Sequence, residues 1–460
     1  MNSRSKHEID MTHGSIFPKL LVFAVPLALS GLLQLTFNAA DIIVLGRFVG
    51  SDALAAVGST GSLNGLLVNF FIGLSVGVNV VVATSYAAGK YKEVSRIVHT
   101  SIALALVSGV VLIFLGYFAA APILRLMGSP EEVLPLSVTY VRIYFLGVPF
   151  ILLYNFGSAA LRSIGDTRRP LYYLTVAGVS NVLLNLLFTI VFRMGVAGVA
   201  IATTASNIIS SLLVVRALIR EDSCLHLDLR KLNLDGKTIL KFAKVGIPAG
   251  IQSVLFSLSN VLIQSSVNSF GAITMAGNSA SSNLEGFQYT VMHCFYTAAI
   301  TFIGQNIGAK KYSRLNRIVC SCLLGEILVS GVFMLIYTFF GQNLLGLYTE
   351  DPLVIEAGMI RLQLFARVYV LCGLMDVSAA GLRGMGYGTL PTVICLFGAV
   401  GIRILWIYTV FASHHDYLVL LSGYPVSWAI TFVIGMIVYF LFRKKLPAND
   451  EEEAVPEQNH

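Results

Sequence analysis

Long runs of apolar residues, separated by short polar breaks, recur along the whole chain. A helix needs about 20 mostly apolar residues to cross a bilayer, and these runs have that length. The strands of a membrane barrel would instead alternate apolar and polar residues, which this sequence does not do. The pattern predicts an all-α integral membrane protein with twelve transmembrane helices, at residues 17–45, 54–85, 94–119, 136–161, 170–192, 196–218, 240–266, 273–302, 316–340, 354–381, 391–411 and 418–442.

The second half of the sequence repeats the first. A shift of 221 residues pairs Gly50 with Gly271 and Arg162 with Arg383, without an insertion between them. Each unit carries six spans, so both enter the membrane from the same side, which predicts two six-helix bundles related by a pseudo-two-fold axis along the membrane normal. The predicted divisions are a cytoplasmic N-terminal tail (1–16), an N-terminal lobe (17–219), a polar cytoplasmic linker (220–237), a C-terminal lobe (238–442) and an acidic cytoplasmic tail (443–460) whose composition is typical of disorder.

Composition and charge narrow the class of protein. Hydrophobic residues make up 56% of the chain and charged residues 12%, which does not suit a water-facing surface. Most of the 31 Lys and Arg residues fall in alternate loops, and the positive-inside rule then predicts a multi-pass protein of the plasma (inner) membrane with both termini cytoplasmic. The scattered charge disfavours nucleic acid as a partner. The six cysteines form no zinc or disulfide pattern, and the polar N-terminus is not a signal peptide.

No soluble-enzyme motif is found, so the chain is not expected to be an enzyme or to hold a cofactor. Ionisable residues inside the spans are costly in hydrocarbon and are therefore functional candidates. Asp41, near the outer end of the first span, shares a helix face with Gln34 and has Asn38 close by. The alternative for Asp41 is a solvated cap at the membrane interface. The four intramembrane carboxylates are Asp41, Glu285, Glu326 and Asp376.

Polar residues of the fifth and sixth spans offer partners for Asp41. Asn181 and Asn185 lie on one face of span five, and span six contributes Thr203, Thr204 and Asn207. A carboxylate with amide and hydroxyl oxygens can hold a hard cation such as Na⁺ or take up a proton. Hydrogen bonding between helices is the alternative role for the two asparagines.

The second half contributes further polar positions. Asp376 in span ten pairs with Asn155 in span four under the same shift, which suggests a central face in each lobe. Glu285, with Gln288 nearby, could line the second lobe, whereas Glu326 stands alone and could be a protonated structural acid. Pro26 lacks an N–H and should kink the first helix, which makes it a candidate hinge.

These residues resemble the multidrug and toxic compound extrusion (MATE) transporters. The resemblance covers residues 15–442 and is carried by Pro26 with the run from Asp41 to Arg47 (DIIVLGR), and by three further segments, ALRSIGDTRRP before and at Pro170, GQNIGAKK at 304–311 and MDVSAAGLRGMG around Asp376. It implies two six-helix bundles around a V-shaped cavity and export of diverse, often cationic, organic compounds in exchange for Na⁺ or H⁺. It also implies a cation-coupling site, and a metal site if Na⁺ is the ion, formed by Asp41, Asn181, Asn185 and Thr203.

Two positions depart from the pattern of that family. Asn185 stands where some members have an aspartate, which removes one charge from the first-lobe site. Members with a second-lobe cation site have a glutamate in span seven, where this chain has Phe256 and Ser257, so that Asp376 is left as half a site. Whether Glu285 replaces the missing acid stays open.

The combined interpretation is an alternating-access antiporter, functional as a monomer, that exports small organic cations. The expected substrate pocket comprises Gln34, Phe37, Asn155, Asn207, Glu285, Gln288 and Asp376. The alternative is a flippase for a lipid-linked sugar or peptidoglycan precursor, whose cavity would carry several Arg or Lys side chains to meet phosphates, whereas the candidate residues here are acids and amides. A membrane-embedded enzyme would need a nucleophile with a base or a metal cluster, and a channel would not need paired six-helix halves.

Overall fold

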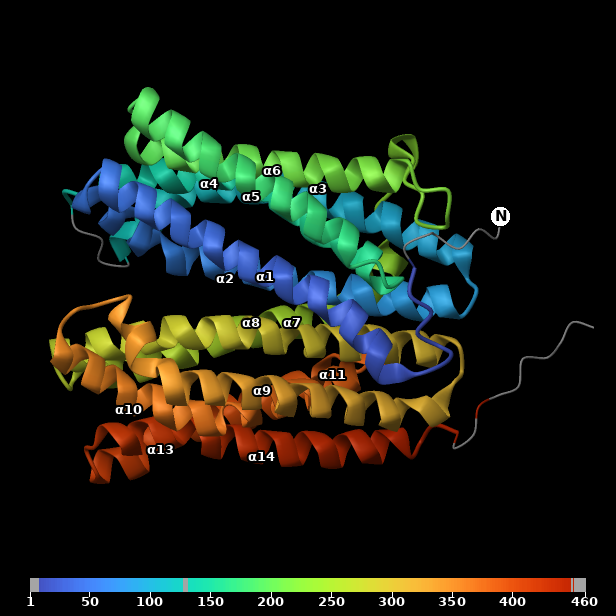
Figure 1. Ribbon diagram of the computed structural model, residues 1–460. Coiled ribbons are helices and arrows are strands. Elements are labelled where there is room, and N and C mark those ends of the chain that lie inside the picture. Colours follow the sequence, from blue (N-terminus) through green and yellow to red (C-terminus); the bar gives the residue numbers. More distant parts are fainter. Residues whose placement is uncertain (1–7, 127–130, 448–449, 451–460) are drawn as a thin grey trace, which may run out of the picture.

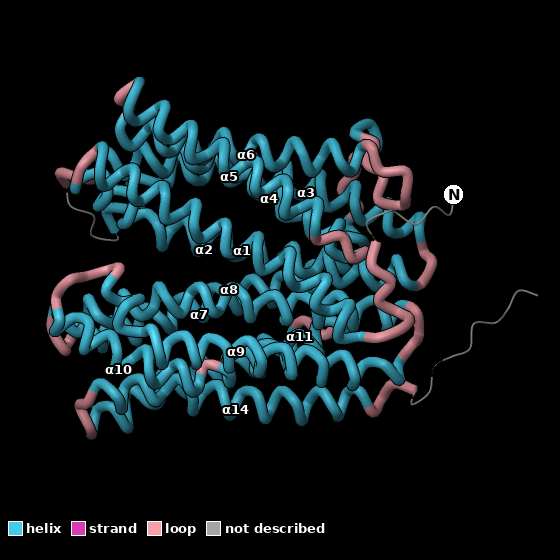
Figure 2. Tube along the Cα trace, viewed as in Figure 1, coloured by secondary structure: helices cyan, strands magenta, loops and turns pink. Residues whose placement is uncertain are grey.

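Residues 8–126, 131–447 and 450 are described by the computed structural model, and over these ranges the chain forms helices and loops without strands (Figure 2). Each of the twelve predicted spans falls on helix. Ten helices of the described residues are long and apolar enough to cross a membrane, and the bent pair α10 and α11 adds an eleventh. The remaining span is α8, which is long enough at 37 residues but carries polar side chains such as Asn278, Glu285 and Gln288.

The helices form two bundles, one from each half of the chain (Figure 1). In the first bundle α5 continues into the π-helical turn η1. The elements of this N-terminal lobe are α1 (Ile16–Phe48), α2 (Ser51–Ala87), α3 (Tyr91–Leu126), α4 (Leu134–Ser163), α5 (Arg168–Leu186), η1 (Leu187–Val191) and α6 (Gly195–Ile219).

The second bundle has more breaks than the first. The eleventh span alternates between α-helical and π-helical segments, and the tenth span, predicted as one helix over 354–381, bends by 46° at Tyr369. The elements are η2 (Leu229–Lys231) in the linker, α7 (Gly236–Asn268), α8 (Ala272–Gly308), η3 (Tyr312–Arg314), α9 (Leu315–Gly346), α10 (Pro352–Val368), α11 (Val370–Gly384), α12 (Thr389–Cys395), η4 (Leu396–Gly401), α13 (Ile402–Trp406), η5 (Ile407–Phe411) and α14 (Tyr417–Arg443).

The backbone repeats along with the sequence. Gly50 and Gly271 precede α2 and α8 with φ of 117° and 89°, and Gly165 and Gly386 follow α4 and α11 with φ of 96° and 92°. Only glycine adopts such angles without strain, so these pairs mark the same turns in both lobes.

The outer faces of both bundles are apolar. Among the described residues Phe118 is 70% exposed, Phe339 is 74% exposed and Tyr408 is 73% exposed. In water such a surface would aggregate, and in a bilayer it faces lipid tails. The chain is accordingly a multi-pass membrane protein.

Glycines join the two lobes along α2, α7 and α8. A Cβ atom on Gly73 would lie 2.3 Å from the backbone nitrogen of Gly250, and one on Gly77 would lie 2.0 Å from the carbonyl oxygen of Phe242. A Cβ on Gly308 would likewise meet the Thr84 carbonyl at 2.1 Å. Small residues at four-residue spacing allow this close approach. We call these contacts the glycine seam.

Polar contacts extend the seam toward the end of the molecule that holds the N-terminal segment and the end of α14, while the ribbons of α1 and α8 diverge toward the opposite end (Figure 1). The Thr301 hydroxyl donates to Asn79 Oδ1 at 3.1 Å, and Gln305 Nε2 donates to the Ser163 carbonyl at 2.7 Å. Each bond crosses from the C-terminal lobe to the N-terminal lobe. The lobes are therefore closed together at the end near the termini.

The segment from Glu8 to Gly14 runs across this closed end and contacts both lobes. Glu8 accepts a hydrogen bond from Tyr86 of α2, whereas the Met11 carbonyl accepts one from Asn306 of α8 at 3.1 Å. The Gly14 carbonyl accepts one from Arg314 at 3.0 Å. Residues 8–14, which we call the strap, therefore tie the N-terminal lobe to the C-terminal lobe.

Three sequence expectations need comment. Arg383 lies beyond the predicted end of the tenth span at residue 381, in what would be a cytoplasmic loop, but α11 continues to Gly384 and buries this side chain at 2% exposure. Its guanidinium donates to Tyr296 and Gln252, and these bonds offset the cost of burial.

Pro26 lies inside the unbroken helix α1, so its hinge role stays a prediction. Of the predicted disordered tail, residues 448–449 and 451–460 lie outside the described residues.

Candidate functional site

The N-terminal lobe holds a ring of hydrogen bonds around Asp41. Asn185 donates to Asp41 Oδ1, and the Thr203 hydroxyl lies 3.4 Å from Asp41 Oδ2. Asn185 Nδ2 also lies 3.3 Å from Asn181 Oδ1, and Asn181 Nδ2 lies 3.5 Å from Thr203 Oγ1. The structure therefore brings together all four residues of the predicted coupling site, from α1, α5 and α6.

The ring forms where α5 ends and the π-helical turn η1 begins. Asn181 and Asn185 are one helical turn apart, so they present their amides to the same neighbour, α1. The π-helical turn follows immediately at Leu187–Val191, and such irregular turns are frequent at functional sites. Asn181 is 4% exposed and Asn185 is fully buried, so water has little access behind Asp41.

The donor atoms of this ring suit a monovalent hard cation. Asp41 supplies two carboxylate oxygens and Thr203 one hydroxyl oxygen, and Asn185 Oδ1 is buried without a hydrogen-bond partner among the described residues. A half-turn of the Asn185 amide would bring that oxygen to the carboxylate side. Only one carboxylate is present, and the described residues contain no cluster of three His, Cys, Asp or Glu side chains that could hold a metal ion.

The other N-terminal candidates do not join this ring. Gln34 is exposed on α1, and Phe37 packs against α5, where a Cβ on Gly178 would overlap its ring. Asn155 donates to the Ile151 carbonyl of its own helix at 2.8 Å. Asn207 is half-buried on α6. None of the four lines the cavity of the C-terminal lobe described next.

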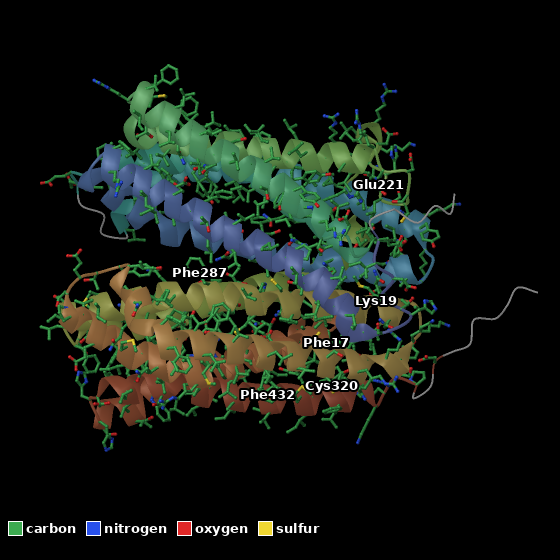
Figure 3. All side chains as sticks on the ribbon, in the orientation of Figure 1. Phe17, Lys19, Glu221, Phe287, Cys320 and Phe432 are labelled. Carbon is green, nitrogen blue, oxygen red and sulfur yellow. The ribbon has the colours of Figure 1, made fainter. Side chains whose placement is uncertain are left out.

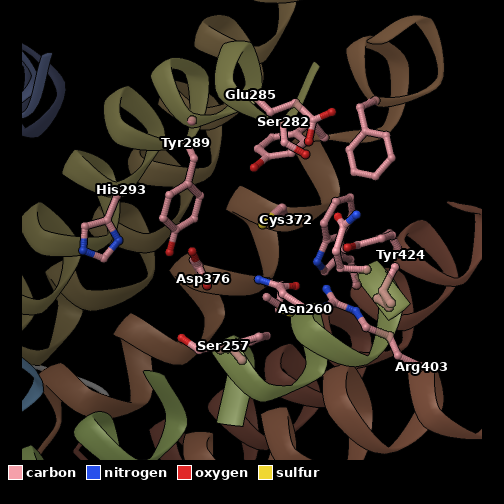
Figure 4. A pocket seen from close by; sticks show the side chains of 18 of the residues that line it. Ser257, Asn260, Ser282, Glu285, Tyr289, His293, Cys372, Asp376, Arg403 and Tyr424 are labelled. Carbon is pink, nitrogen blue, oxygen red and sulfur yellow. The ribbon is translucent and has the colours of Figure 1, made fainter. Parts of the chain in front are cut away.

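The C-terminal lobe contains a cavity of about 560 Å³ (Figure 4). Its walls come from α7, α8, α10, α11, α13 and α14, with Asn69 and Ile72 of α2 at its edge. Of the predicted pocket residues Glu285 and Asp376 line it, whereas Gln288 is fully buried with no partner for its amide among the described residues. Phe256 and Ser257, which replace the acid of span seven, also line the cavity.

The two acids of this cavity differ in their partners. Glu285 forms a bidentate ion pair with Arg361, with distances of 2.8 Å to Nε and 2.7 Å to Nη2. Arg361 Nη1 is held by Asn278 at 2.7 Å, so the charge of Glu285 is compensated within the protein. Asp376 has no ion-pair partner among the described residues, and the Tyr289 hydroxyl points toward its carboxyl group (Figure 4). Glu285 is therefore not free to act as a second cation ligand beside Asp376.

Glu326 belongs to neither site. Its side chain is fully buried, and neither carboxyl oxygen has a hydrogen-bond partner within the described ranges. It packs against α11, where a Cβ on Gly373 would lie 2.3 Å from Oε2.

Sequence reasoning missed the cations of the cavity. Arg361 and Arg403 both line it, although the candidate residues were expected to be acids and amides. The sequence contained a signal for these arginines, because both lie inside predicted spans. An arginine in the membrane is as costly as an acid and is equally a functional candidate.

Comparison with known proteins identifies the family. The MatE family model matches residues 26–187 and again 248–409, once in each lobe. The chain belongs to the MatE family. The double match confirms the internal repeat, since both copies begin at a proline inside the first helix of a lobe.

Relatives cover nearly the whole chain. "Probable multidrug resistance protein YoeA" of Bacillus subtilis (strain 168) is 30% identical over 94% of this chain and 95% of its own. The "FAD transporter" of Shewanella oneidensis is 25% identical over 92% of this chain and 94% of its own. A solved structure described as the outward-facing conformation of a multidrug resistance MATE family transporter aligns with a TM-score of 0.90 at 20% identity, covering 97% of this chain and 99% of that one.

These matches confirm the predicted fold class of two helical bundles in a MATE transporter. The MatE chain is thus a membrane transporter related to multidrug efflux proteins.

Proposed function

We propose that this MatE protein is a Na⁺- or H⁺-coupled antiporter that exports organic compounds from the cytoplasm by alternating access, as a monomer in the plasma (inner) membrane with both termini cytoplasmic. The observation that supports this most is the ring around Asp41, where one carboxylate and the three neutral polar side chains of Asn181, Asn185 and Thr203 meet inside the membrane. A lone intramembrane carboxylate is held in a low dielectric, so a proton or Na⁺ stabilises it strongly.

Ion binding at Asp41 couples the ion to the substrate. When the ion enters from outside, it neutralises Asp41 and favours the state of the lobes that releases the substrate. Because the ion and the substrate favour different states of the lobes, the ion gradient can drive export. The glycine seam is the contact that must open for the lobes to face the cytoplasm.

The names of the relatives point to substrates other than cations. One relative is named a multidrug resistance protein and another an FAD transporter, and FAD carries an anionic diphosphate. The flippase alternative would need several uncompensated cations in the cavity. Glu285 neutralises Arg361, so Arg403 is the one uncompensated cation among the described residues that line the cavity. The lining therefore favours export of small organic compounds over export of a lipid-linked phosphate.

The test is efflux of a fluorescent cationic dye such as ethidium from vesicles of controlled orientation, under separately imposed Na⁺ and proton gradients. Transport by the wild type should follow one of the two gradients. Asp41→Asn should abolish it, while Asp222→Asn, in the exposed linker, should leave it intact. Normal transport by Asp41→Asn would overturn the coupling site. A folded wild type that moves no dye under either gradient would argue for lipid-linked precursors.

A further inference from the structure

Arg403 carries a buried positive charge that the protein does not neutralise. The side chain is 3% exposed and lines the C-terminal cavity from α13. Among the described residues no carboxylate lies within ion-pair distance of it, and its one hydrogen bond runs from Nε to the Ser427 hydroxyl at 3.2 Å. Burying a cation without a counter-charge is costly, so this arrangement needs an explanation.

Arg361 and Arg383, which are also buried, use their terminal nitrogens in hydrogen bonds, unlike Arg403. Arg361 uses three nitrogens on Glu285 and Asn278. Arg383, which is absent from the cavity lining, donates to three side chains of α7, α8 and α12. Neither terminal nitrogen of Arg403 has a hydrogen bond to the described part of the chain, although five N–H groups in a planar fork are available on each guanidinium.

Aromatic rings hold the Arg403 guanidinium in place. Its Cζ lies 4.4 Å from the ring centre of Tyr424, 5.7 Å from that of Trp428 and 5.8 Å from that of Phe256. The π faces stabilise a cation without using its N–H groups. The terminal N–H groups thus stay available to a ligand in the cavity.

The local helix geometry supports a ligand-binding role. α13 is a five-residue segment between two π-helical stretches, η4 and η5. Such irregularities re-aim side chains and are concentrated at functional sites.

Asp376 supplies the opposite charge in the same cavity. Figure 4 shows Asp376 and Arg403 on either side of Asn260, with the carboxyl beside Tyr289 and the guanidinium beside Tyr424. The cavity, at about 560 Å³, falls in the range that takes a drug-sized molecule. Its walls are therefore suited to a ligand with an anion at one end and a cation at the other.

We propose that the C-terminal cavity binds aromatic zwitterions, with the carboxylate of the ligand on Arg403, its cationic group on Asp376 and its ring system against Phe256, Tyr424 and Trp428. This inference rests on the proposed export function and names a substrate class for it. An arginine fork pairs with a carboxylate through two parallel hydrogen bonds, which gives selectivity over a neutral ester.

A matched pair of dyes tests the assignment. One is a cationic xanthene dye with a free carboxylate, and the other is its methyl ester, which keeps the ring system and the positive charge. Binding to purified protein in detergent is measured by fluorescence polarisation. Arg403→Gln should weaken binding of the carboxylate dye about ten- to a hundredfold, because a hydrogen-bonded charge pair is lost, and should leave the ester within about twofold.

Arg142→Gln is the control. Arg142 also sits 4.4 Å from a tyrosine ring centre, that of Tyr117, but outside the cavity. This variant should bind both dyes like the wild type. Arg403→Lys keeps the positive charge but lacks the two-pronged guanidinium, so its affinity for the carboxylate dye should fall between those of the wild type and Arg403→Gln. This intermediate affinity separates loss of anion binding from a folding defect.

Three results would overturn the proposal. Arg403→Gln could weaken both dyes equally, it could weaken neither, or the wild type could fail to bind the carboxylate dye. If the ester is still bound and exported in those cases, the proposed export function stands and the zwitterion site alone fails. If the wild type neither binds nor exports either dye, both fail.

Discussion

The two lobes share a fold but not their chemistry. Under the 221-residue shift Asp41 pairs with Leu262 and Asn185 with Trp406, while Arg403 pairs with Val182. The N-terminal lobe has a compact ring of one carboxylate and neutral partners, and the C-terminal lobe has a large cavity lined by two acids and two arginines. The backbone turns at Gly165 and Gly386 were kept in both copies, but the polar side chains were not.

The difference suggests a division of labour. A small ring with one carboxylate favours a small ion, whereas a cavity of about 560 Å³ lined by charges of both signs favours an organic molecule. Figure 3 shows side chains throughout both bundles. The ring and the cavity are built from different helices, so movement of the lobes can connect them.

The first and largest contrast is in stability. Glu285→Gln leaves Arg361 buried without its counter-charge, at a cost of about 3–5 kcal/mol, whereas Asp41→Asn removes a charge whose partners are neutral and should hardly change the melting temperature. Melting temperatures in detergent measure both. The double variant Glu285→Gln with Arg361→Met should recover most of the loss, and equal destabilisation by Asp41→Asn and Glu285→Gln would erase the contrast between the lobes.

The seam gives the second prediction. Gly77→Ala places a Cβ where the Phe242 carbonyl lies, so the lobes must shift apart, at a cost of about 1–3 kcal/mol to the closed seam. Dye export should fall, while dye binding in the C-terminal cavity stays near the wild type. Gly65→Ala, on the same helix with its nearest atom 3.9 Å away, is the control. Loss of dye binding in Gly77→Ala would mean that the cavity depends on the seam.

The fold followed from the sequence more completely than the sites did. Apolar runs and repeated glycines predicted the spans and the two lobes because lipid burial acts on every residue of a helix. The Asp41 ring was predictable because Asn181 and Asn185 stand one turn apart on one face of span five, and the resemblance to the MATE transporters implies Thr203 of span six as the further partner. The C-terminal cavity was not, because the partner of Arg361 lies 76 positions away in the chain, and only packing shows that Arg403 has none.

The third prediction concerns ion binding in the Asp41 ring. Thr203→Val removes a hydroxyl that lies 3.4 Å from Asp41 Oδ2, and one such contact is worth about 1 kcal/mol. The half-saturating concentration of the coupling ion should rise about fivefold in transport assays, with dye affinity in the C-terminal cavity unchanged. The control is Thr204→Val, whose hydroxyl bonds the Ile143 carbonyl at 3.2 Å outside the ring. A matching change in the Thr204→Val protein would show that the effect is not specific to the ring.

The smallest effect concerns the strap, which ties the two lobes together. Burial raises the pKa of Asp10, but hydrogen bonds from Thr12 and the charge of His13 outweigh this and lower the pKa to about 2. A lowered pKa stabilises the folded state above the ordinary value of 3.8, and this contribution is lost as the pH falls toward about 2. Asp10→Asn should therefore lower the melting temperature slightly near neutral pH, and the difference from the wild type should shrink as the pH falls toward about 2. A difference that did not shrink in acidic solution would contradict this assignment.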